Sequence, residues 1–356
     1  MKLLHVISSL SGGGAERQLS YLLPALAARG HEVHVAYLTT GPRPPDFGDT
    51  GVILHPIQHA SNYDPRILLS LLGFVRRLQP DVVHSWIVQM DVLAGVVTRV
   101  TGVPWVFREA SCEVRAAARG PKERCRRVVS RWARYIVANS RGGHSYWERL
   151  RPEIPKCVIM NGISSTPFKG NRRPRGERHG RVLFAGRLVP LKQAAMLTRA
   201  FGRFAQNLGC ELTICGTGSE EPAIRRLCQQ LGIEERVHLL GHVSQDMLVE
   251  EMGRSDLLVN PSLYEGCPNV VLEAMAASCP VAVSDIPAHR DILDEETALF
   301  FDPKDDQSLE RALHTGVTEA TQGELRARQA RAKAEEFSID GMAGRYCDVY
   351  DLVRQG

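Results

Sequence analysis

The chain has 356 residues, of which 44% are hydrophobic and 24% are charged, and its formal net charge is +4. This length suits two domains better than one, and the small positive charge does not argue for a nucleic acid partner. Nine cysteines without a C-x-x-C pair favour a reducing cytoplasm over a disulfide framework or a zinc site. No run of about 18 apolar residues is present, so no membrane-spanning helix is predicted.

The first half of the chain alternates short apolar runs with amphipathic stretches. Residues 3–10 and 32–38 are expected to form strands, and residues 15–30 a helix that Gly30 closes. Five further apolar runs are expected to be strands: residues 52–57, 81–86, 104–109, 135–140 and 157–163. Strands that alternate with helices indicate a parallel, doubly wound sheet.

The second half repeats this pattern after residues 164–180, which are polar, basic and rich in Gly and Pro and indicate a linker. Expected strands follow at residues 181–188, 211–216, 236–241, 255–262 and 280–285. The predicted fold is α/β, with two Rossmann-like, doubly wound domains, residues 1–163 and 181–335, facing each other across a cleft. Residues 336–356 are expected to form a helix that packs back on the first domain. Ligands bind beyond the carboxyl ends of such strands, so the cleft is the expected site.

A run of three glycines, Gly12, Gly13 and Gly14, follows the first expected strand. Glycine lets the backbone approach a ligand closely, and the helix that follows offers its amides to an anion. Glu16 and Arg17 occupy this turn, and the G-x-G-x-x-G pattern of dinucleotide sites is absent. The turn is therefore a candidate ligand contact, and the alternative is a tight turn without a ligand.

Two cations lie close together in the second half. Arg187 follows a strand and Lys192 comes five residues later, near the start of a helix. Two cations at a helix N-terminus can hold a diphosphate, and the alternative is a pair of solvated surface charges. Gly216 and Gly218 follow the next strand and favour a close approach of the backbone to a nucleotide, without identifying a cofactor.

Two glutamates eight residues apart, Glu265 and Glu273, frame the start of an expected helix. The backbone amides of Asn269, Val270 and Val271 begin this helix and can hold a phosphate. A carboxylate accepts hydrogen bonds from a diol, as in ribose or a hexose. A phosphate site with a diol site on either side matches the chemical layout of a nucleotide sugar. Alternatively, a glutamate near a helix start merely interacts favourably with the helix dipole.

Taken together, these motifs resemble the family 4 retaining glycosyltransferases, which have the two-domain GT-B fold. The resemblance covers nearly the whole chain, and its most specific element is the pair of glutamates in "EGCPNVVLEAMA", an E-x7-E motif. It implies that Glu265 contacts the transferred sugar and that Glu273 contacts the ribose of the nucleoside. By the same resemblance, Arg187 and Lys192 hold the diphosphate.

The resemblance also implies a role for the glycine turn, since Gly13 and Gly14 would close on the sugar phosphate. One departure concerns a strand end where many relatives carry a histidine and this chain has Arg108 and Glu109. Arg108 is the candidate replacement contact. His84 ends the preceding strand and is equally well explained as a buried histidine.

The implied reaction transfers a sugar from a nucleoside diphosphate sugar to an acceptor hydroxyl with retention of configuration, in surface polysaccharide, lipid-linked oligosaccharide or glycolipid synthesis. A UDP-sugar is expected in preference to a GDP-sugar, and no resident cofactor or metal is expected because no D-x-D triplet is present. Three alternatives remain: a nucleotide-sugar epimerase, an NAD-dependent oxidoreductase, and an inactive nucleotide-sugar-binding subunit. The missing dinucleotide pattern disfavours the oxidoreductase.

Residues 113–135 form a basic segment that suggests where an acceptor is met. Four arginines recur at helical spacing, and an apolar stripe is predicted beside them: Arg124, Arg127, Arg131 and Arg134, with Cys125, Val128, Val129 and Trp132. The functional interpretation is a patch for an anionic membrane surface or a lipid-linked pyrophosphate, which would place a cytoplasmic protein at the inner face of a membrane. The alternative is a surface helix that buries its apolar face.

Overall fold

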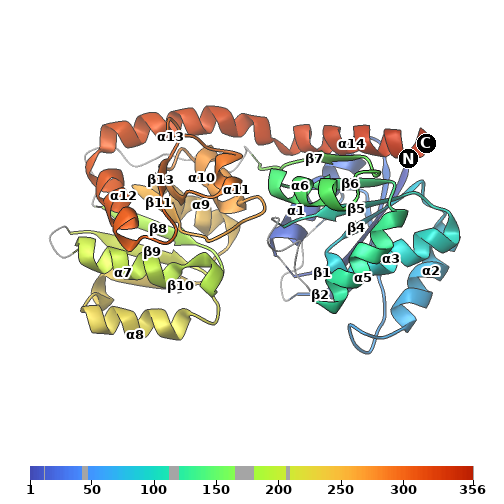
Figure 1. Ribbon diagram of the computed structural model, residues 1–356, viewed down its shortest axis with the longest axis horizontal. Coiled ribbons are helices and arrows are strands. Elements are labelled where there is room, and N and C mark those ends of the chain that lie inside the picture. The colour runs from blue at the N-terminus through green and yellow to red at the C-terminus, as the bar shows by residue number, and fades with distance from the viewer. Residues whose placement is uncertain (12, 42–46, 112–119, 165–179, 206–208, 356) are drawn as a thin grey trace. The chain divides into compact units, whose positions relative to one another are not determined.

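The structure is a computed structural model that describes residues 1–11, 13–41, 47–111, 120–164, 180–205 and 209–355. It divides into two compact units. Unit 1 comprises Met1–Gly162 and Ile339–Gly356, and unit 2 comprises Ile163–Ser338 (Figure 1). Most of the predicted linker, residues 165–179, and Gly12 lie outside the described residues.

Unit 1 contains a parallel sheet of seven strands in the order β3-β2-β1-β4-β5-β6-β7. The strands are β1 (Lys2–Leu10), β2 (Glu32–Thr40), β3 (Val52–Pro56), β4 (Val82–Trp86), β5 (Trp105–Glu109), β6 (Tyr135–Ala138) and β7 (Lys156–Val158). The helices are α1 (Gly14–Ala27), α2 (Arg66–Leu78), α3 (Val88–Thr101), α5 (Pro121–Val129), the 3-10 turn η1 (Ser130–Trp132), α6 (Arg141–Leu150) and α14 (Ile339–Gln355). Strands β4 and β5 are buried at every residue, as expected for a parallel sheet that is covered on both faces.

Unit 2 contains a parallel sheet of six strands in the order β10-β9-β8-β11-β12-β13. The strands are β8 (Arg181–Ala185), β9 (Glu211–Cys215), β10 (Val237–Gly241), β11 (Leu257–Asn260), β12 (Val281–Ser284) and β13 (Leu299–Phe301). The helices are η3 (Pro190–Lys192), α7 (Ala194–Phe204), α8 (Glu221–Leu231), η5 (Glu234–Arg236), α9 (Gln245–Arg254), α10 (Asn269–Ala276), α11 (Pro287–Arg290), α12 (Asp306–Thr318), α13 (Ala320–Ala334) and η6 (Glu335–Phe337). The sheets confirm the predicted pair of parallel α/β folds.

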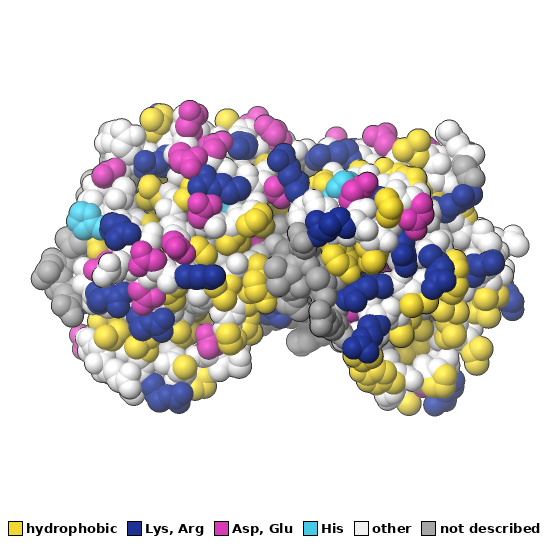
Figure 2. All heavy atoms as spheres, in the orientation of Figure 1, with side chains coloured by type: hydrophobic (Ala, Val, Ile, Leu, Met, Phe, Trp, Pro, Cys, Tyr) yellow, Lys and Arg dark blue, Asp and Glu magenta, His cyan; other side chains and the backbone are white. Residues whose placement is uncertain are grey.

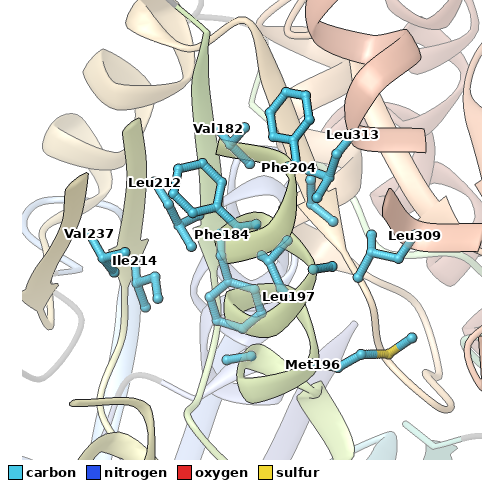
Figure 3. Packing of buried hydrophobic residues seen from close by; sticks show 14 of the residues in the cluster. Val182, Phe184, Met196, Leu197, Phe204, Leu212, Ile214, Val237, Leu309 and Leu313 are labelled. Carbon is cyan, nitrogen blue, oxygen red and sulfur yellow. The ribbon is translucent and has the colours of Figure 1, made fainter. Parts of the chain in front are cut away.

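Each unit has its own hydrophobic core. In unit 2, side chains of β8 and β9 pack against α7 and α12, as Phe184, Leu197 and Leu313 illustrate (Figure 3). In unit 1, the C-terminal helix α14 buries Tyr346 and Tyr350 in the same cluster as residues of α1 and β1. None of the helices in the described part of the chain is long and apolar enough to cross a membrane.

A buried histidine, His84, connects α14 to the sheet of unit 1, and a second, His5, lies beside it. His84 Nδ1 lies 2.7 Å from the hydroxyl oxygen of Tyr350, and Trp86 Nε1 donates to His5 Nδ1 at 3.2 Å. Burial lowers the pKa of His5 to about 3 and the pKa of His84 well below its ordinary value. Both imidazoles are therefore neutral in the folded protein at physiological pH.

This burial predicts that unit 1 loses stability in mild acid. A histidine of the unfolded chain has a pKa of about 6.5, so below this pH it binds a proton that the folded chain excludes. From about pH 7.5 to about 5.5 each histidine should lower the free energy of unfolding by about 1.4 kcal/mol. Asp91 has the opposite effect, because burial raises its pKa to about 6 and it gains a proton in the folded state as the pH falls. Its gain in the free energy of unfolding is smaller than the loss caused by one histidine. Urea unfolding at both pH values measures the sum.

The variant His84→Gln separates the contribution of one histidine. Its stability at neutral pH should fall, because the contact with Tyr350 changes, but its loss between the two pH values should be smaller than that of the wild type. The exposed His314 provides the matched control, and His314→Gln should keep the full loss. An unchanged loss in His84→Gln would contradict a neutral, buried His84.

Candidate functional site

Charged side chains gather where the adjacent strands β8 and β11 of unit 2 end. The loop after β8 leads to Lys192 and the loop after β11 to Glu265, and the amide of Leu263 donates to the carbonyl of Leu191 at 3.0 Å. Lys192 Nζ forms an ion pair with Glu265 Oε1, although the two side chains are only 18% and 12% exposed. Parallel strands thus bring two residues 73 positions apart into direct contact.

Glu265 is held in the ionised form by its neighbours. Ser262 Oγ lies 2.7 Å from Glu265 Oε1 and 2.6 Å from Asn260 Oδ1. Burial alone would raise the pKa of Glu265, but the charge of Lys192 and the hydrogen bonds from Lys192 and Ser262 outweigh it and lower that pKa. Glu265 therefore offers a carboxylate in a largely desolvated position.

A histidine that the sequence interpretation did not select adjoins this pair. His289 in α11 is fully buried, and its Nδ1 donates to the carbonyl of Ser284 at 2.7 Å. Ser284 Oγ donates in turn to the carbonyl of Ser262 at 2.6 Å. Burial, partly offset by the Ser284 carbonyl and the charge of Glu265, lowers the pKa of His289 to about 4. Its position just after β12 was the available signal, since ligands collect at strand ends.

Arg187 lies in the loop between β8 and η3, and its side chain is exposed. It has no acidic partner among the described residues. Lys192, by contrast, is engaged with Glu265. The two predicted clamp cations are thus five residues apart on one loop, one available to a ligand and the other paired with a carboxylate.

The helix α10 begins at Asn269, as predicted, and Glu273 is its fifth residue, in the second turn. The side chain of Glu273 is buried. The amide of Val271 donates to the carbonyl of Pro268 at 3.0 Å. Of the three amides proposed for phosphate, that of Val271 therefore already has an acceptor, and Asn269 and Val270 form the start of the helix.

Gly216 and Gly218 are explained by contacts within the protein. A Cβ atom at Gly216, whose φ is +149°, would lie 1.8 Å from the carbonyl oxygen of Gly186, and one at Gly218 would lie 2.3 Å from that of Leu188. The amide of Leu188 donates to the carbonyl of Thr217 at 2.9 Å. The two glycines let the loops after β8 and β9 pack backbone against backbone, which fixes the path that leads to Lys192.

In unit 1, the glycine turn begins α1, with Gly13 as the N-cap and Gly14 as the first residue. Both are exposed, whereas Glu16 is buried. A Cβ atom at Gly13 would lie 2.4 Å from Glu16 Oε2, so the carboxylate folds back over the start of the helix. The positive end of α1 therefore already faces an acidic group. The neighbouring Arg17 is partly buried.

The other candidates of unit 1 are core residues. Arg108 is 1% exposed, stacks on the ring of Trp86 at 4.4 Å and donates to Asn161 Oδ1. Glu109 is also buried and accepts from Trp147 Nε1 at 2.9 Å. His84 is held by α14, as described above. The interpretation of His84 as a buried histidine is confirmed, and internal contacts account for the polar groups of Glu109.

The basic segment is described from residue 120 onward, and the predicted continuous stripe of arginines is wrong. α5 ends at Val129, so Arg131 lies in η1 and Arg134 just before β6. Arg126 turns inward, with its Nε 2.7 Å from Asp91 Oδ2 and its Nη1 2.6 Å from Glu109 Oε2. No sequence pattern indicates this buried network, because one more arginine in a basic run is indistinguishable from a surface charge.

The apolar stripe of the same segment is only partly buried. Val129 is buried, but Val128 is 49% exposed and Trp132 is 36% exposed. The exposed arginines of this region are Arg124, Arg131 and Arg134. Figure 2 shows basic side chains among hydrophobic ones over the region of α5. This surface, residues 124–134, is called the α5 patch below.

Among the residues that the structure describes, no three or more His, Cys, Asp or Glu side chains cluster as a metal site would require. The candidate site of unit 2 instead combines cations, the start of a helix and ionised carboxylates at the ends of parallel strands. Such a set suits a ligand with phosphates and hydroxyl groups.

Comparisons with known proteins agree with this description. Residues 12–166 match a family model described as Glycosyltransferase Family 4, and residues 179–318 match one described as Glycosyl transferases group 1. A glycogen synthase of Mycobacterium tuberculosis is 26% identical over 97% of this chain and 92% of its own length. An uncharacterized glycosyltransferase of Methanocaldococcus jannaschii is 30% identical, over 57% of this chain and 56% of that one.

Among solved structures, the Anabaena protein HepE in complex with UDP-glucose superposes with a TM-score of 0.86, at 18% identity, and covers 99% of this chain and 100% of its own. The two α/β units and the superposed structures define the GT-B fold, and the family models define a glycosyltransferase. Within that class, the chain belongs to glycosyltransferase family 4.

The close packing of the β8 and β9 loops leads to a test. Gly216→Ala should lower the free energy of unfolding by more than about 3 kcal/mol, because the new methyl group would collide with a neighbouring backbone. Gly253 in α9 has nothing within 4 Å of an added Cβ, so Gly253→Ala should be neutral or stabilise by up to about 1 kcal/mol. Urea unfolding measures both, and equal stability of Gly216→Ala and the wild type would contradict the packing.

Proposed function

We propose that this glycosyltransferase is a retaining, metal-independent enzyme that transfers a sugar from a UDP-sugar to an acceptor hydroxyl. The observation that carries the proposal is the largely buried ion pair of Lys192 and Glu265, with the exposed Arg187 on the same loop as Lys192. Two cations on one loop suit a diphosphate, and an adjacent ionised carboxylate suits sugar hydroxyls. The UDP-glucose bound by the Anabaena protein of like fold supports a UDP-sugar as the donor.

Each side chain has a proposed task. Arg187 and Lys192, with the amides at the start of α10, stabilise the negative charge that develops on the leaving diphosphate. Glu265 accepts hydrogen bonds from the transferred sugar, and Glu273 accepts them from the ribose. In this mechanism a phosphate oxygen of the leaving group takes the proton of the acceptor hydroxyl. The sugar then keeps its configuration, because the acceptor attacks from the face that the diphosphate leaves.

The proposal is tested with UDP-glucose in the presence of EDTA. The wild-type protein should bind UDP-glucose and release UDP slowly by hydrolysis, or faster with an acceptor, and EDTA should change neither. Glu265→Gln should lower turnover at least about 100-fold without weakening the binding of UDP, because the sugar contact is lost while Lys192 is released from its ion pair and stays available to the phosphates.

Glu273→Gln is the matched comparison, since it makes the same chemical change eight residues away. It should weaken the binding of UDP itself, because ribose is part of UDP. Equal effects of both substitutions on UDP affinity would contradict the assignment of sugar and ribose. Loss of all activity with EDTA would contradict metal independence.

On the acceptor side, we propose that the α5 patch meets an anionic membrane surface that carries a lipid-linked acceptor, as in surface polysaccharide or glycolipid synthesis. Its exposed arginines supply charge, and the exposed Val128 and Trp132 supply an apolar surface beside them. Arginine and tryptophan are suited to the boundary between lipid headgroups and water. The proposed location is the cytoplasmic face of the membrane.

The patch predicts salt-sensitive membrane binding. The protein should sediment with vesicles that contain anionic lipid and not with neutral ones, and moderate salt should release it. Arg124→Glu with Arg131→Glu should weaken binding at least about tenfold, because each basic residue contributes about 1 kcal/mol near an anionic leaflet. The matched control reverses two exposed arginines of α2, Arg76 and Arg77, and should bind almost normally. Equal loss in both variants would point to net charge and not to the patch.

A further inference from the structure

His289 occupies an unusual position for a group without an assigned task. It is fully buried beside the ion pair of Lys192 and Glu265, and both charges act on its ring. Its Nδ1 is used by the carbonyl of Ser284, at 2.7 Å. Its Nε2 is buried and has no hydrogen-bond partner among the described residues. A buried nitrogen without a partner costs free energy in this state, and such a group calls for an explanation, which use in another state of the protein can supply.

Donor binding changes the charges around this ring. In the structure described here, Lys192 neutralises Glu265. The proposed function, on which this inference rests, gives the same ammonium group to the diphosphate of the donor. Once the phosphates attract Lys192, Glu265 remains as a largely buried carboxylate with Ser262 as its neighbour. A buried carboxylate that loses its cation is strongly destabilised unless another cation replaces it.

His289 can supply that replacement. We propose that His289 is a positioning residue of the donor site, which takes up a proton at Nε2 when a nucleoside diphosphate sugar draws Lys192 away from Glu265. The proton comes from solvent, and no covalent bond of the donor changes. The imidazolium then provides the positive charge that keeps the Glu265 carboxylate ionised and in place for the sugar.

The other charges around the ring favour this exchange. Asp285 at the end of β12 is already neutralised by Arg290, whose Nε and Nη2 lie 2.7 and 2.9 Å from its two oxygens. The remaining charges that act on His289 are those of Lys192 and Glu265. Lys192 opposes protonation and Glu265 favours it, so movement of Lys192 away from the ring shifts the balance towards the imidazolium.

The test is calorimetric titration with UDP-glucose, whose two phosphates have no proton that titrates near neutral pH. At about pH 6.5, two buffers with different ionisation enthalpies should give different binding enthalpies, which shows proton uptake by the wild-type protein. The affinity should also rise as the pH falls from about 7.5 to about 6, by up to about tenfold per unit. Equal enthalpies in both buffers, or an affinity that does not depend on pH, would overturn the inference.

Substitutions assign the proton to His289. His289→Asn retains an N–H group for the Ser284 carbonyl but cannot be protonated, so it should bind UDP-glucose without proton uptake. His289→Gln serves the same purpose if the first variant does not fold. His314→Asn, at an exposed histidine of α12, is the matched control and should retain the uptake.

The outcomes separate this inference from the proposed function. Uptake that persists in folded His289→Asn or His289→Gln would overturn the role of His289 alone, as would binding by the wild type without any uptake. A wild-type protein that does not bind UDP-glucose would overturn the proposed function and this inference with it.

Discussion

The ion pair between Lys192 and Glu265 is the contact on which the candidate site depends. A buried ion pair contributes little net stability, because desolvation of both charges offsets their attraction, but loss of one partner is costly. The pair is therefore well suited to exchange its partners with a ligand that brings charges of its own. In the proposed function, the diphosphate of the donor attracts the lysine, and sugar hydroxyl groups satisfy the glutamate. Without the donor, the ion pair keeps both side chains in the site, because each group takes the place of the ligand group that the other would bind.

The fold enforces this pairing through backbone contacts. Adjacent parallel strands β8 and β11 place the loops that follow them side by side, and the backbone hydrogen bond from Leu263 to Leu191 joins the two loops. Gly216 and Gly218 allow the neighbouring loops to pack without side chains between them. Unit 1 shows the contrasting case. There Arg126 is paired with both Asp91 and Glu109, so its guanidinium is engaged within the unit and its contacts are structural.

The sequence predicted the sheets well, because parallel strands buried on both faces appear as continuous apolar runs. It did not predict β13, which has three residues, or the helices α12 and α13, whose apolar faces are interrupted by charges. In the site, the motif indicated Glu265 and Lys192 but not their direct contact, since spacing along the chain says nothing of pairing across a sheet. His289 was not predicted because a single histidine forms no motif with the residues next to it in the sequence. The buried contacts of Arg126 and the packing of Gly216 were not predicted for a related reason, since their partners lie on other elements.

A crystal structure of the protein with UDP-glucose tests most directly whether Lys192 and Glu265 exchange each other for the donor. We expect Lys192 Nζ and the guanidinium of Arg187 within hydrogen-bonding distance of phosphate oxygens, with Glu265 on hydroxyl groups of the glucose. We also expect the direct contact between Lys192 and Glu265 to be broken. A complex in which that contact persists while the phosphates lie away from both cations would contradict the exchange.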